Sequence, residues 1–547
     1  MMPESPAPTA TGEPPTGPPP GCPAHGLGPG GLHRLAEADD LEGLYEELRE
    51  RYGPVAPALL HDDVPVWVVL GHAENLLMVS SPSQFCRDSR IWTPLKEGMV
   101  RPDHPLMPHI AWQPIASHTE GDEHKRLRGA VSGALSTIDY RSLRRHIQRH
   151  TQRLVNRFCE AGRADLVGQF AEHLPMGVMC EILGMARDYD DRLVEAARDA
   201  LKGTETAIAS HDHVMEVLSR LTARRRAEPA EDFTTHLINH PARLTDDEVR
   251  EHLRLVLFAG YENTANLLSN VLRVVLTDPG FRAQLNGGQM TVPEAVEQSL
   301  WDEPPFSTIF AYFAKQDTEL GGQRIRQGDG LLFGIAPGNV DPRIRPDLSA
   351  GMQGNRAHLA FGGGPHECPG QDIGRAIADA GVDALLMRLP DVRLAVPEEE
   401  LTWRSSIASR HLVRLPVRFE PRPPQDVRQQ PSHTPVPPPR APWHVGAPLP
   451  ELSAGPAAGT VTTPAWPEAP SPDRPEREPE RPEWPAPAEE PEPGRWPAPA
   501  ERSEPGEGPV RQGVRVPGDS VPPSVAVDGP ERPRGAWQRF LRWWRGQ

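Results

Sequence analysis

The sequence has little cysteine, few aromatic residues and no long apolar run. Its 5 cysteines are scattered along 547 residues and form neither a disulfide framework nor a C-x-x-C metal pair, so a reducing cytoplasm is the simplest setting. No apolar stretch approaches the roughly 18 residues that span a bilayer, and the start MMPESPAPTATGEPP lacks the basic and apolar regions of a signal peptide. The net charge of -17 argues against general nucleic-acid binding. We therefore expect a cytoplasmic protein with no nucleic-acid partner.

Proline, in contrast, is abundant: the chain has 66, concentrated toward its two ends. Residues 1–30 are mainly Pro, Gly, Ala and Thr, with too little apolar content to fold alone. Residues 421–533 form a second proline-rich segment that repeats W-P-A-P-A-E. We expect both segments to be disordered, which leaves residues 31–420 as one folded body that can bury a large core.

The last stretch, residues 534–547, differs from the proline-rich segment before it. Its aromatic and apolar residues recur at helical spacing, with arginines toward the other side, which predicts a short basic amphipathic helix. Such a helix suits an anionic membrane surface or a groove on a signalling partner, and could hold the protein peripherally at a membrane. A frayed tail is an equal alternative, because about ten residues are marginal as a free helix.

The most informative stretch is F-G-G-G-P-H-E-C-P-G, residues 361–370, which precedes a helix-compatible segment at 371–389. A thiolate just before a helix N-terminus is stabilised by the helix dipole and by backbone N–H groups. The glycines remove side chains that would keep a large flat cofactor off the backbone. We expect Cys368 to be an anionic metal ligand; the alternative is a buried structural cysteine.

The pattern F-x-x-G-x-H-x-C-x-G resembles the haem-binding loop of the cytochromes P-450, the haem-thiolate monooxygenases. The resemblance implies haem b with Cys368 as the iron ligand, and cofactor-binding places for Phe361, Gly364, His366 and Gly370. It also implies a mainly α fold with a smaller β region, over residues from about 40 to 418.

Two other positions extend the resemblance at the cofactor. In the segment G-D-E-H-K-R-L-R, His124 and Arg128 are four residues apart on an expected helix, so both can reach one anion. In the family this pair holds the haem propionates, whereas by itself it would more simply be a solvated basic face. His358, three residues before the loop, matches a further propionate-binding position.

A long buried helix is expected after the capping box T-D-D-E at 245–248, because the next thirty or so residues are apolar nearly all round. Its centre, A-G-Y-E-N-T, breaks this pattern, and a buried acid usually marks a site. In the family the matching A-G-x-[DE]-T lies over the iron, where the acid and the alcohol carry protons to bound dioxygen. Ala259, Gly260 and Glu262 match it.

The alcohol of that motif does not match, because Asn263 follows the acid and Thr264 comes one residue late. Asparagine can hold a water but cannot relay a proton through a hydroxyl, so delivery through substrate, ordered water or Thr264 stays open. Glu262, Asn263 and Thr264 are therefore the catalytic candidates. The alternative for Glu262 is a bond to a neighbouring backbone group.

Two departures from the family concern charged residues. Family members carry E-x-x-R on a later helix, but here Gln298 and Trp301 stand in its place, and together they could make one neutral hydrogen bond. The string E-Q-S-L-W resembles a small actinobacterial subgroup without E-x-x-R, whose orphan enzymes are often encoded beside small-GTPase-type signalling genes. The second departure is Tyr312-Phe313, where family members place a propionate-binding Arg just before Ala314.

The resemblance implies a monooxygenase that inserts one oxygen atom from dioxygen into a small apolar organic substrate, with electrons from an iron–sulfur ferredoxin. A basic area could steer that acidic partner; it comprises Lys125, Arg126, Arg144, Arg145, Arg149 and Arg153. Two alternatives remain open. One is a haem-binding sensor or scaffold without turnover, suggested by the missing alcohol, the missing E-x-x-R and the tail. The other is a peroxide-driven peroxygenase, which needs no ferredoxin.

Overall fold

The computed structural model describes residues 32–426 except 39, 102, 103, 105, 106, 190, 203–205 and 353. The expected leader at 1–30, nearly all of the proline-rich segment at 421–533 and the expected tail at 534–547 lie outside the described residues. Within the described ranges, no helix combines the length and the apolar character that crossing a membrane requires.

The described body is mainly helical with smaller sheets, which confirms the expected fold class. Its helices are α1 (Leu41–Tyr52), α2 (His72–Val79), α3 (Thr93–Lys96), α4 (Met107–Ile110), α5 (Gly121–Leu135), α6 (Tyr140–Asn156), α7 (His173–Leu183), α8 (Asp191–Lys202), α9 (Ala207–Ala227), α10 (Phe233–Ile238), α11 (Asp246–Thr277), α12 (Pro279–Asn286), α13 (Val292–Asp302), α14 (Ile335–Asn339) and α15 (Gln371–Arg388). Its strands are β1 (Val55–Leu59), β2 (Pro65–Val69), β3 (Phe85–Cys86), β4 (Arg163–Asp165), β5 (Thr308–Ala314), β6 (Thr318–Leu320), β7 (Gln323–Ile325), β8 (Gly330–Gly334), β9 (Arg393–Leu394), β10 (Trp403–Ser405), β11 (Arg410–Leu412) and β12 (Pro416–Arg418).

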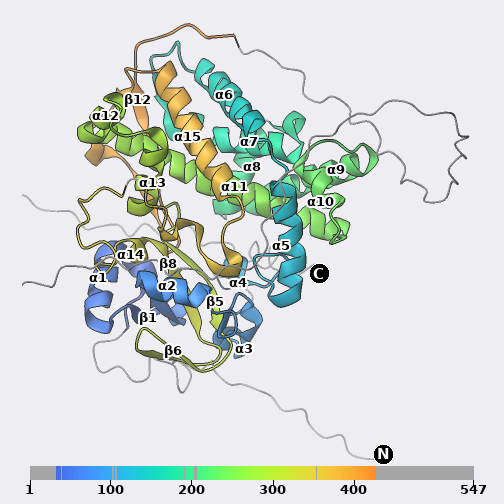
Figure 1. The fold of residues 1–547 in the computed structure, drawn as a ribbon, viewed down its shortest axis with the longest axis vertical. Coiled ribbons are helices and arrows are strands. Elements are labelled where there is room, and N and C mark those ends of the chain that lie inside the picture. The colour runs from blue at the N-terminus through green and yellow to red at the C-terminus, as the bar shows by residue number, and fades with distance from the viewer. Residues whose placement is uncertain are drawn as a thin grey trace, which may run out of the picture. The chain divides into compact units, whose positions relative to one another are not determined.

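The largest sheet has five strands in the order β1-β2-β8-β5-β3. Strand β2 pairs with β8 in parallel, and the other neighbours are antiparallel. Its central strands β2 and β8 are buried along their whole length, because α1, α2 and α14 cover the sheet (Figure 1). The sheet brings β3, near the start of the chain, beside β5, more than two hundred residues later.

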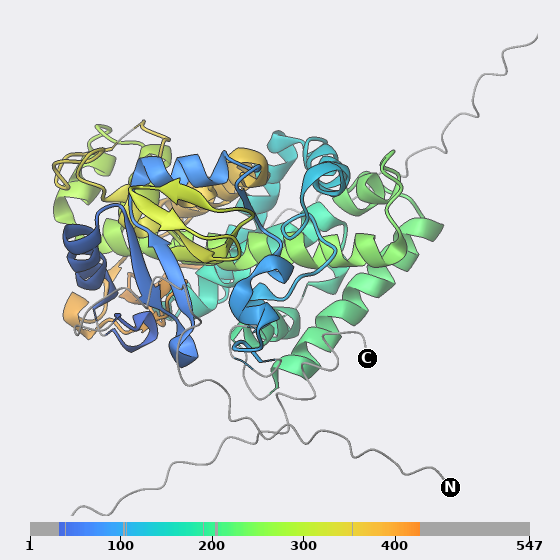
Figure 2. The ribbon, with the colours of Figure 1, turned by 90° about the horizontal axis from the view of Figure 1, so that it is seen from below.

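Helix α11 is the central element of the helical layer. Thr245 accepts a hydrogen bond from the backbone N–H of Glu248, and the Glu248 side chain accepts one from the Thr245 N–H, so the expected capping box is present. The helix packs against α7, α9, α13 and α15. Figure 2, seen from the sheet side, shows α11 running behind the sheet across the body. The expectation of a long buried helix is therefore confirmed.

Candidate active site

The loop that carries Cys368 is closed by a hydrogen bond from the Cys368 N–H to the carbonyl oxygen of Phe361, at 2.9 Å. Gly362 and Gly364 have φ values of 69° and 62°, in the region that favours glycine. A Cβ on Gly364 would also lie 2.1 Å from the carbonyl oxygen of Val79. Gly362 and Gly364 are thus required by the loop itself, which ends where α15 begins at Gln371.

The Cys368 thiol differs from the sequence-based expectation. Part of the Cys368 surface is accessible, yet the atoms packed around the sulfur raise the pKa of its thiol. The Gly370 backbone N–H, Arg128 and Arg375 act in the opposite direction but do not outweigh this burial. The helix start alone therefore does not make Cys368 a thiolate; a metal cation at the sulfur would supply the missing stabilisation.

Three of the predicted cofactor-binding side chains gather beside this loop. The imidazole rings of His124 and His366 lie 4.2 Å apart between centroids. Arg128 donates from Nη2 to the carbonyl oxygen of Glu367, directly before Cys368, and from Nε to Ser132 at 3.0 Å. His124 Nε2 is buried and has no hydrogen-bond partner within the described ranges. The structure thus brings α5 and the loop together.

Glu120 and Arg87 belong to the same group, and the sequence analysis missed both. Glu120 accepts from His366 Nε2 at 3.2 Å and from the Arg87 N–H at 2.6 Å, and so fixes the orientation of the His366 ring. Burial, followed by the charge of His366, lowers the pKa of His124 to about 4. Near neutral pH the His124 ring is therefore neutral and can donate from one nitrogen only. No sequence motif marks Glu120 or Arg87.

Both ring nitrogens of His358 are hydrogen-bonded to other groups of the protein. Its Nε2 lies 3.0 Å from Glu297 Oε2, and its Nδ1 accepts from the Ala360 N–H at 3.2 Å. Glu297 also accepts from Arg375 Nε at 2.6 Å, and the Arg375 guanidinium lies over the Phe361 ring. A role for His358 toward a propionate stays a prediction, and it would require the bond to Glu297 to exchange.

The substitutes for E-x-x-R do not bond to each other, contrary to expectation. Gln298 accepts from the Met352 N–H at 2.6 Å and donates to Asp302 at 2.7 Å. Trp301, which is fully buried, donates to the carbonyl oxygen of Asn355 at 2.8 Å. Each side chain finds a partner of its own, because both face the segment that leads into the Cys368 loop.

Charge pairs persist at the two positions that flank this motif. Glu297, directly before Gln298, pairs with Arg375 of α15. Asp302, directly after Trp301, pairs with Arg345 at 2.6 Å, and only 4% of the Arg345 side chain is exposed. Ion pairs at both flanking positions therefore hold α13 to its neighbours although E-x-x-R is absent.

The central residues of α11 point in different directions. Ala259 and Asn263 share one face, and Asn263 donates from Nδ2 to the Ala259 carbonyl oxygen at 3.0 Å. Ala259 is exposed in the middle of a buried helix, as expected for a residue that faces a cavity. Gly260 faces α7, where a Cβ would lie 2.7 Å from Met179 Sδ. Thr264 is buried, and a Cβ on Gly374 of α15 would lie 3.8 Å from its hydroxyl.

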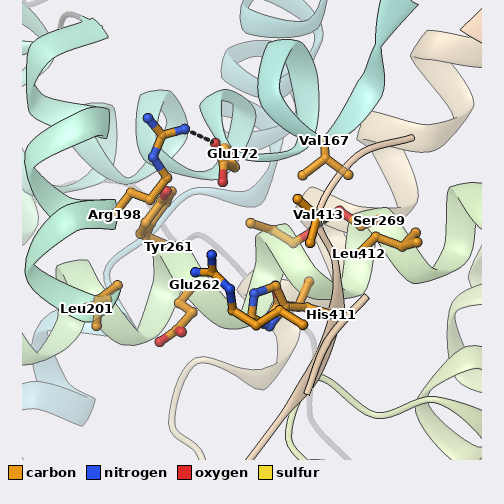
Figure 3. Close-up of a pocket in the computed structure, with 13 residues that line it drawn as sticks. Val167, Glu172, Arg198, Leu201, Tyr261, Glu262, Ser269, His411, Leu412 and Val413 are labelled. Atoms are coloured by element: carbon orange, nitrogen blue, oxygen red, sulfur yellow. Dashed lines mark hydrogen bonds and ion pairs between the residues drawn. The ribbon is translucent and has the colours of Figure 1, made fainter. Parts of the chain in front are cut away.

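Glu262 lines a pocket of mixed polar and apolar side chains between α11, α8 and the β10–β11 hairpin (Figure 3). Arg198 and Glu172 form an ion pair at 2.9 Å on one wall, and His411 lies on another. The remaining lining residues are Val167, Leu201, Tyr261, Ala265, Asn266, Ser269, Arg404, Leu412 and Val413. The alternative of a Glu262 that bonds a neighbouring backbone group stays open.

The donor set fits a flat cofactor that carries carboxylates and a thiolate-binding metal. A buried imidazole nitrogen of His124 lacks a partner among the described residues, and the Arg128 guanidinium lies beside it. The sulfur of Cys368 and the exposed Ala259 come from the two elements that would face such a group. Haem has this combination of carboxylates and metal.

Comparisons with known proteins agree with this interpretation. No family model matches the chain. It is 31% identical over 379 residues to cytochrome P-450 SU2 of Streptomyces griseolus, covering 68% of this chain and 91% of the relative. It is 30% identical over 391 residues to mycinamicin IV hydroxylase/epoxidase of Micromonospora griseorubida, covering 69% and 95%. The solved structure of CYP154A1 from Streptomyces coelicolor A3(2) superposes with a TM-score of 0.63 at 28% identity, covering 71% of this chain and 100% of that one.

Proposed function

Since the chain belongs to the cytochrome P-450 superfamily and is a haem-thiolate monooxygenase, we propose that it oxidises a small apolar organic substrate with electrons from a ferredoxin. The observation that carries the site assignment is the gathering of His124, Arg128 and His366 beside the loop of Cys368. Four side chains from two distant segments meet there, which supports one shared cofactor.

We assign these side chains as follows. Cys368 would be the iron ligand, and haem, when bound, supplies the activation of dioxygen. Arg128 and His124 would hold the propionates by N–H donation, because the guanidinium brings a positive charge to a carboxylate and the neutral His124 ring can donate from one nitrogen. The N–H at His366 Nε2 is used by Glu120, so His366 would line the cofactor beside them. Glu120 would keep the His366 ring in the orientation that the loop shows.

Proton supply would come from the face of α11 that carries Glu262. The pocket beside Glu262 is also lined by the ion pair of Glu172 and Arg198. Charged groups of this kind would hold water in the pocket next to the Glu262 carboxyl. Asn263 uses Nδ2 for the Ala259 carbonyl, and its Oδ1 has no hydrogen-bond partner in the described part of the chain. This oxygen would accept from a water and orient it, in place of the usual alcohol.

The ferredoxin would dock on the side of α5 and α6, whose sequences hold more basic than acidic residues. The positive field of this area is weaker than the sequence suggested, because several of its basic residues form ion pairs. Lys125 pairs with Asp122, and Arg149 pairs with Glu181. Arg126 pairs with both Glu123 and Glu248. We therefore expect weak, salt-sensitive docking. A membrane surface or signalling partner for residues 534–547 stays a prediction from the sequence.

The test is a carbon monoxide difference spectrum of the dithionite-reduced full chain, followed by turnover with NADPH, a ferredoxin reductase and a ferredoxin. The wild type should give the red-shifted Soret band of thiolate ligation, and Cys368→Ala should lose it. Cys159→Ala is the matched control, because Cys159 is buried in a different part of the fold. A retained thiolate band in Cys368→Ala would refute the ligand assignment. Turnover with peroxide but never with ferredoxin would favour the peroxygenase alternative.

A further inference from the structure

The pairing of β3 with β5 brings Arg87 close to the place on β5 where family members have an Arg and this chain does not. Phe85 pairs with Ala314 and Cys86 with Phe313 in antiparallel register. Continuing this register by one residue sets Arg87 opposite Tyr312, and paired residues of an antiparallel ladder project from the same face. Tyr312 belongs to the pair Tyr312-Phe313, which stands where the family pattern has a propionate-binding Arg.

The Arg87 side chain follows this geometry. Its guanidinium carbon lies 5.0 Å from the centroid of the Tyr312 ring, within the range of a cation–π contact. Its Nε is buried and has no hydrogen-bond partner in the described body. No carboxylate of the described residues forms an ion pair with it. A half-buried guanidinium with an unused N–H is costly unless an anion completes it.

The neighbours of Arg87 show which region it serves. Its backbone N–H is bound to Glu120, which also accepts from His366. After burial, which is the largest cause, the Arg87 charge contributes to lowering the pKa of both His124 and His366. The guanidinium therefore lies beside the same imidazoles that gather at the Cys368 loop, while Glu120 holds the Arg87 backbone N–H.

We infer that Arg87 binds a haem propionate, taking over from the neighbouring strand the place that an Arg on β5 has in the family. The Tyr312 ring supports the guanidinium from one side and leaves its N–H edges for a carboxylate. The inference rests on the proposed haem site and adds to it a binding residue that no motif identifies.

Haem transfer from the full-length holoprotein to excess apomyoglobin tests this role without relying on catalysis. Arg87→Gln should lose haem about tenfold faster than the wild type, the effect of removing one charge-assisted hydrogen bond. Arg90→Gln is the matched control, because Arg90 is three residues away, pairs with Asp88 and stacks on Trp112. It should stay within about twofold of the wild type.

Moving the guanidinium back to β5 gives the sharper test. The double variant Arg87→Ser with Tyr312→Arg should release haem nearly as slowly as the wild type, and more slowly than Arg87→Ser alone. The thermal unfolding midpoint of each variant should equal that of Arg90→Gln. Faster haem loss then reflects the lost contact and not general unfolding. If Arg87→Gln does not fold, comparing the rate of haem loss from the double variant with that from Arg87→Ser tests the inference instead.

Two results would overturn the inference. One is haem loss from Arg87→Gln that is no faster than from Arg90→Gln. The other is a double variant that releases haem as fast as Arg87→Ser. Failure of the haem site itself would look different, because the wild type would then show no thiolate band with carbon monoxide and no transferable haem.

Discussion

The Nδ2 group of Asn263 donates to the carbonyl oxygen of Ala259, one helical turn earlier, at 3.0 Å. A threonine hydroxyl could make a bond to the same acceptor, since Ser and Thr in helices often bond to the carbonyl four residues back. The asparagine keeps this bond and adds a carboxamide oxygen, which has no partner in the described part of the chain. Asn263 therefore makes the hydrogen bond within the helix that a threonine hydroxyl would make, but it has no hydroxyl through which to relay a proton.

Asn263→Ala should lower the yield of oxidised product per NADPH by about tenfold or more, because no side chain would then orient a proton-carrying water. Asn263→Thr should retain at least the wild-type yield. The measurement is product against NADPH consumed, with hydrogen peroxide recorded as the uncoupled product. Equal yields for the alanine variant and the wild type would exclude a role for Asn263 in proton supply.

Restoring the family motif with Gln298→Glu and Trp301→Arg should destabilise this chain. The first change sets a second carboxylate against Asp302, and the second puts a guanidinium into the buried space of an indole that stacks on His72. We expect a loss of about 2 kcal/mol or more in urea unfolding, with faster haem loss. Trp301→Phe is the control, at about 1 kcal/mol for the lost bond to Asn355. A change under about 0.5 kcal/mol in the double variant would contradict this account.

Two glycines of the Cys368 loop should respond differently to alanine. Gly364→Ala should cost more than about 1 kcal/mol of folding free energy, because φ is positive and the Cβ would meet the Val79 carbonyl. Gly370→Ala should leave unfolding within about 0.5 kcal/mol, since no atom of the described residues lies within 4 Å of its Cβ. If haem lies against Gly370, the same variant should still bind haem more weakly in a titration. Unchanged haem affinity would remove Gly370 from the cofactor surface.

His118 should make stability fall on mild acidification. Burial, and then the charges of Arg87 and Arg254, lower its pKa to about 3, whereas an unfolded histidine titrates near 6.5. Between these values the unfolded state binds more protons, so the free energy of unfolding decreases as the pH falls, by up to about 1.4 kcal/mol per pH unit from this group. Above the unfolded pKa the contribution no longer changes with pH.

His118→Gln should reduce that slope in urea unfolding measured at about pH 7.5, 6.5 and 5.5. The bond that His118 Nδ1 accepts from the Gln113 N–H is lost at every pH, so it shifts the curve without changing the slope. An identical slope in variant and wild type would show that folding does not lower the pKa of His118.

The sequence predicted those parts of the fold that depend on local patterns. The capping box at Thr245 and the apolar run after it specify α11, and the glycines around Cys368 specify the loop. His124 and Arg128 could be paired because helical spacing alone puts them on one face. These features need no knowledge of which distant segments meet.

The features that the sequence did not reveal depend on long-range register or on burial. Arg87 becomes informative only when β3 is laid beside β5, and Glu297 only when α13 meets α15. The elevated pKa of the Cys368 thiol follows from the packing around it, which outweighs the helix start. Gly260 makes room for Met179 of α7, a close approach that the sequence does not show, and its role toward the cofactor stays a prediction.

The two ion pairs that flank Gln298 and Trp301 bear on how this chain diverged. Breaking a buried charge pair one member at a time is strongly unfavourable, at about 3–5 kcal/mol. A lineage could lose E-x-x-R without unfolding only after Glu297 with Arg375 and Asp302 with Arg345 already held α13 in place. Those neighbouring pairs would then be ancestral, and close relatives that still carry E-x-x-R should be found to possess them too.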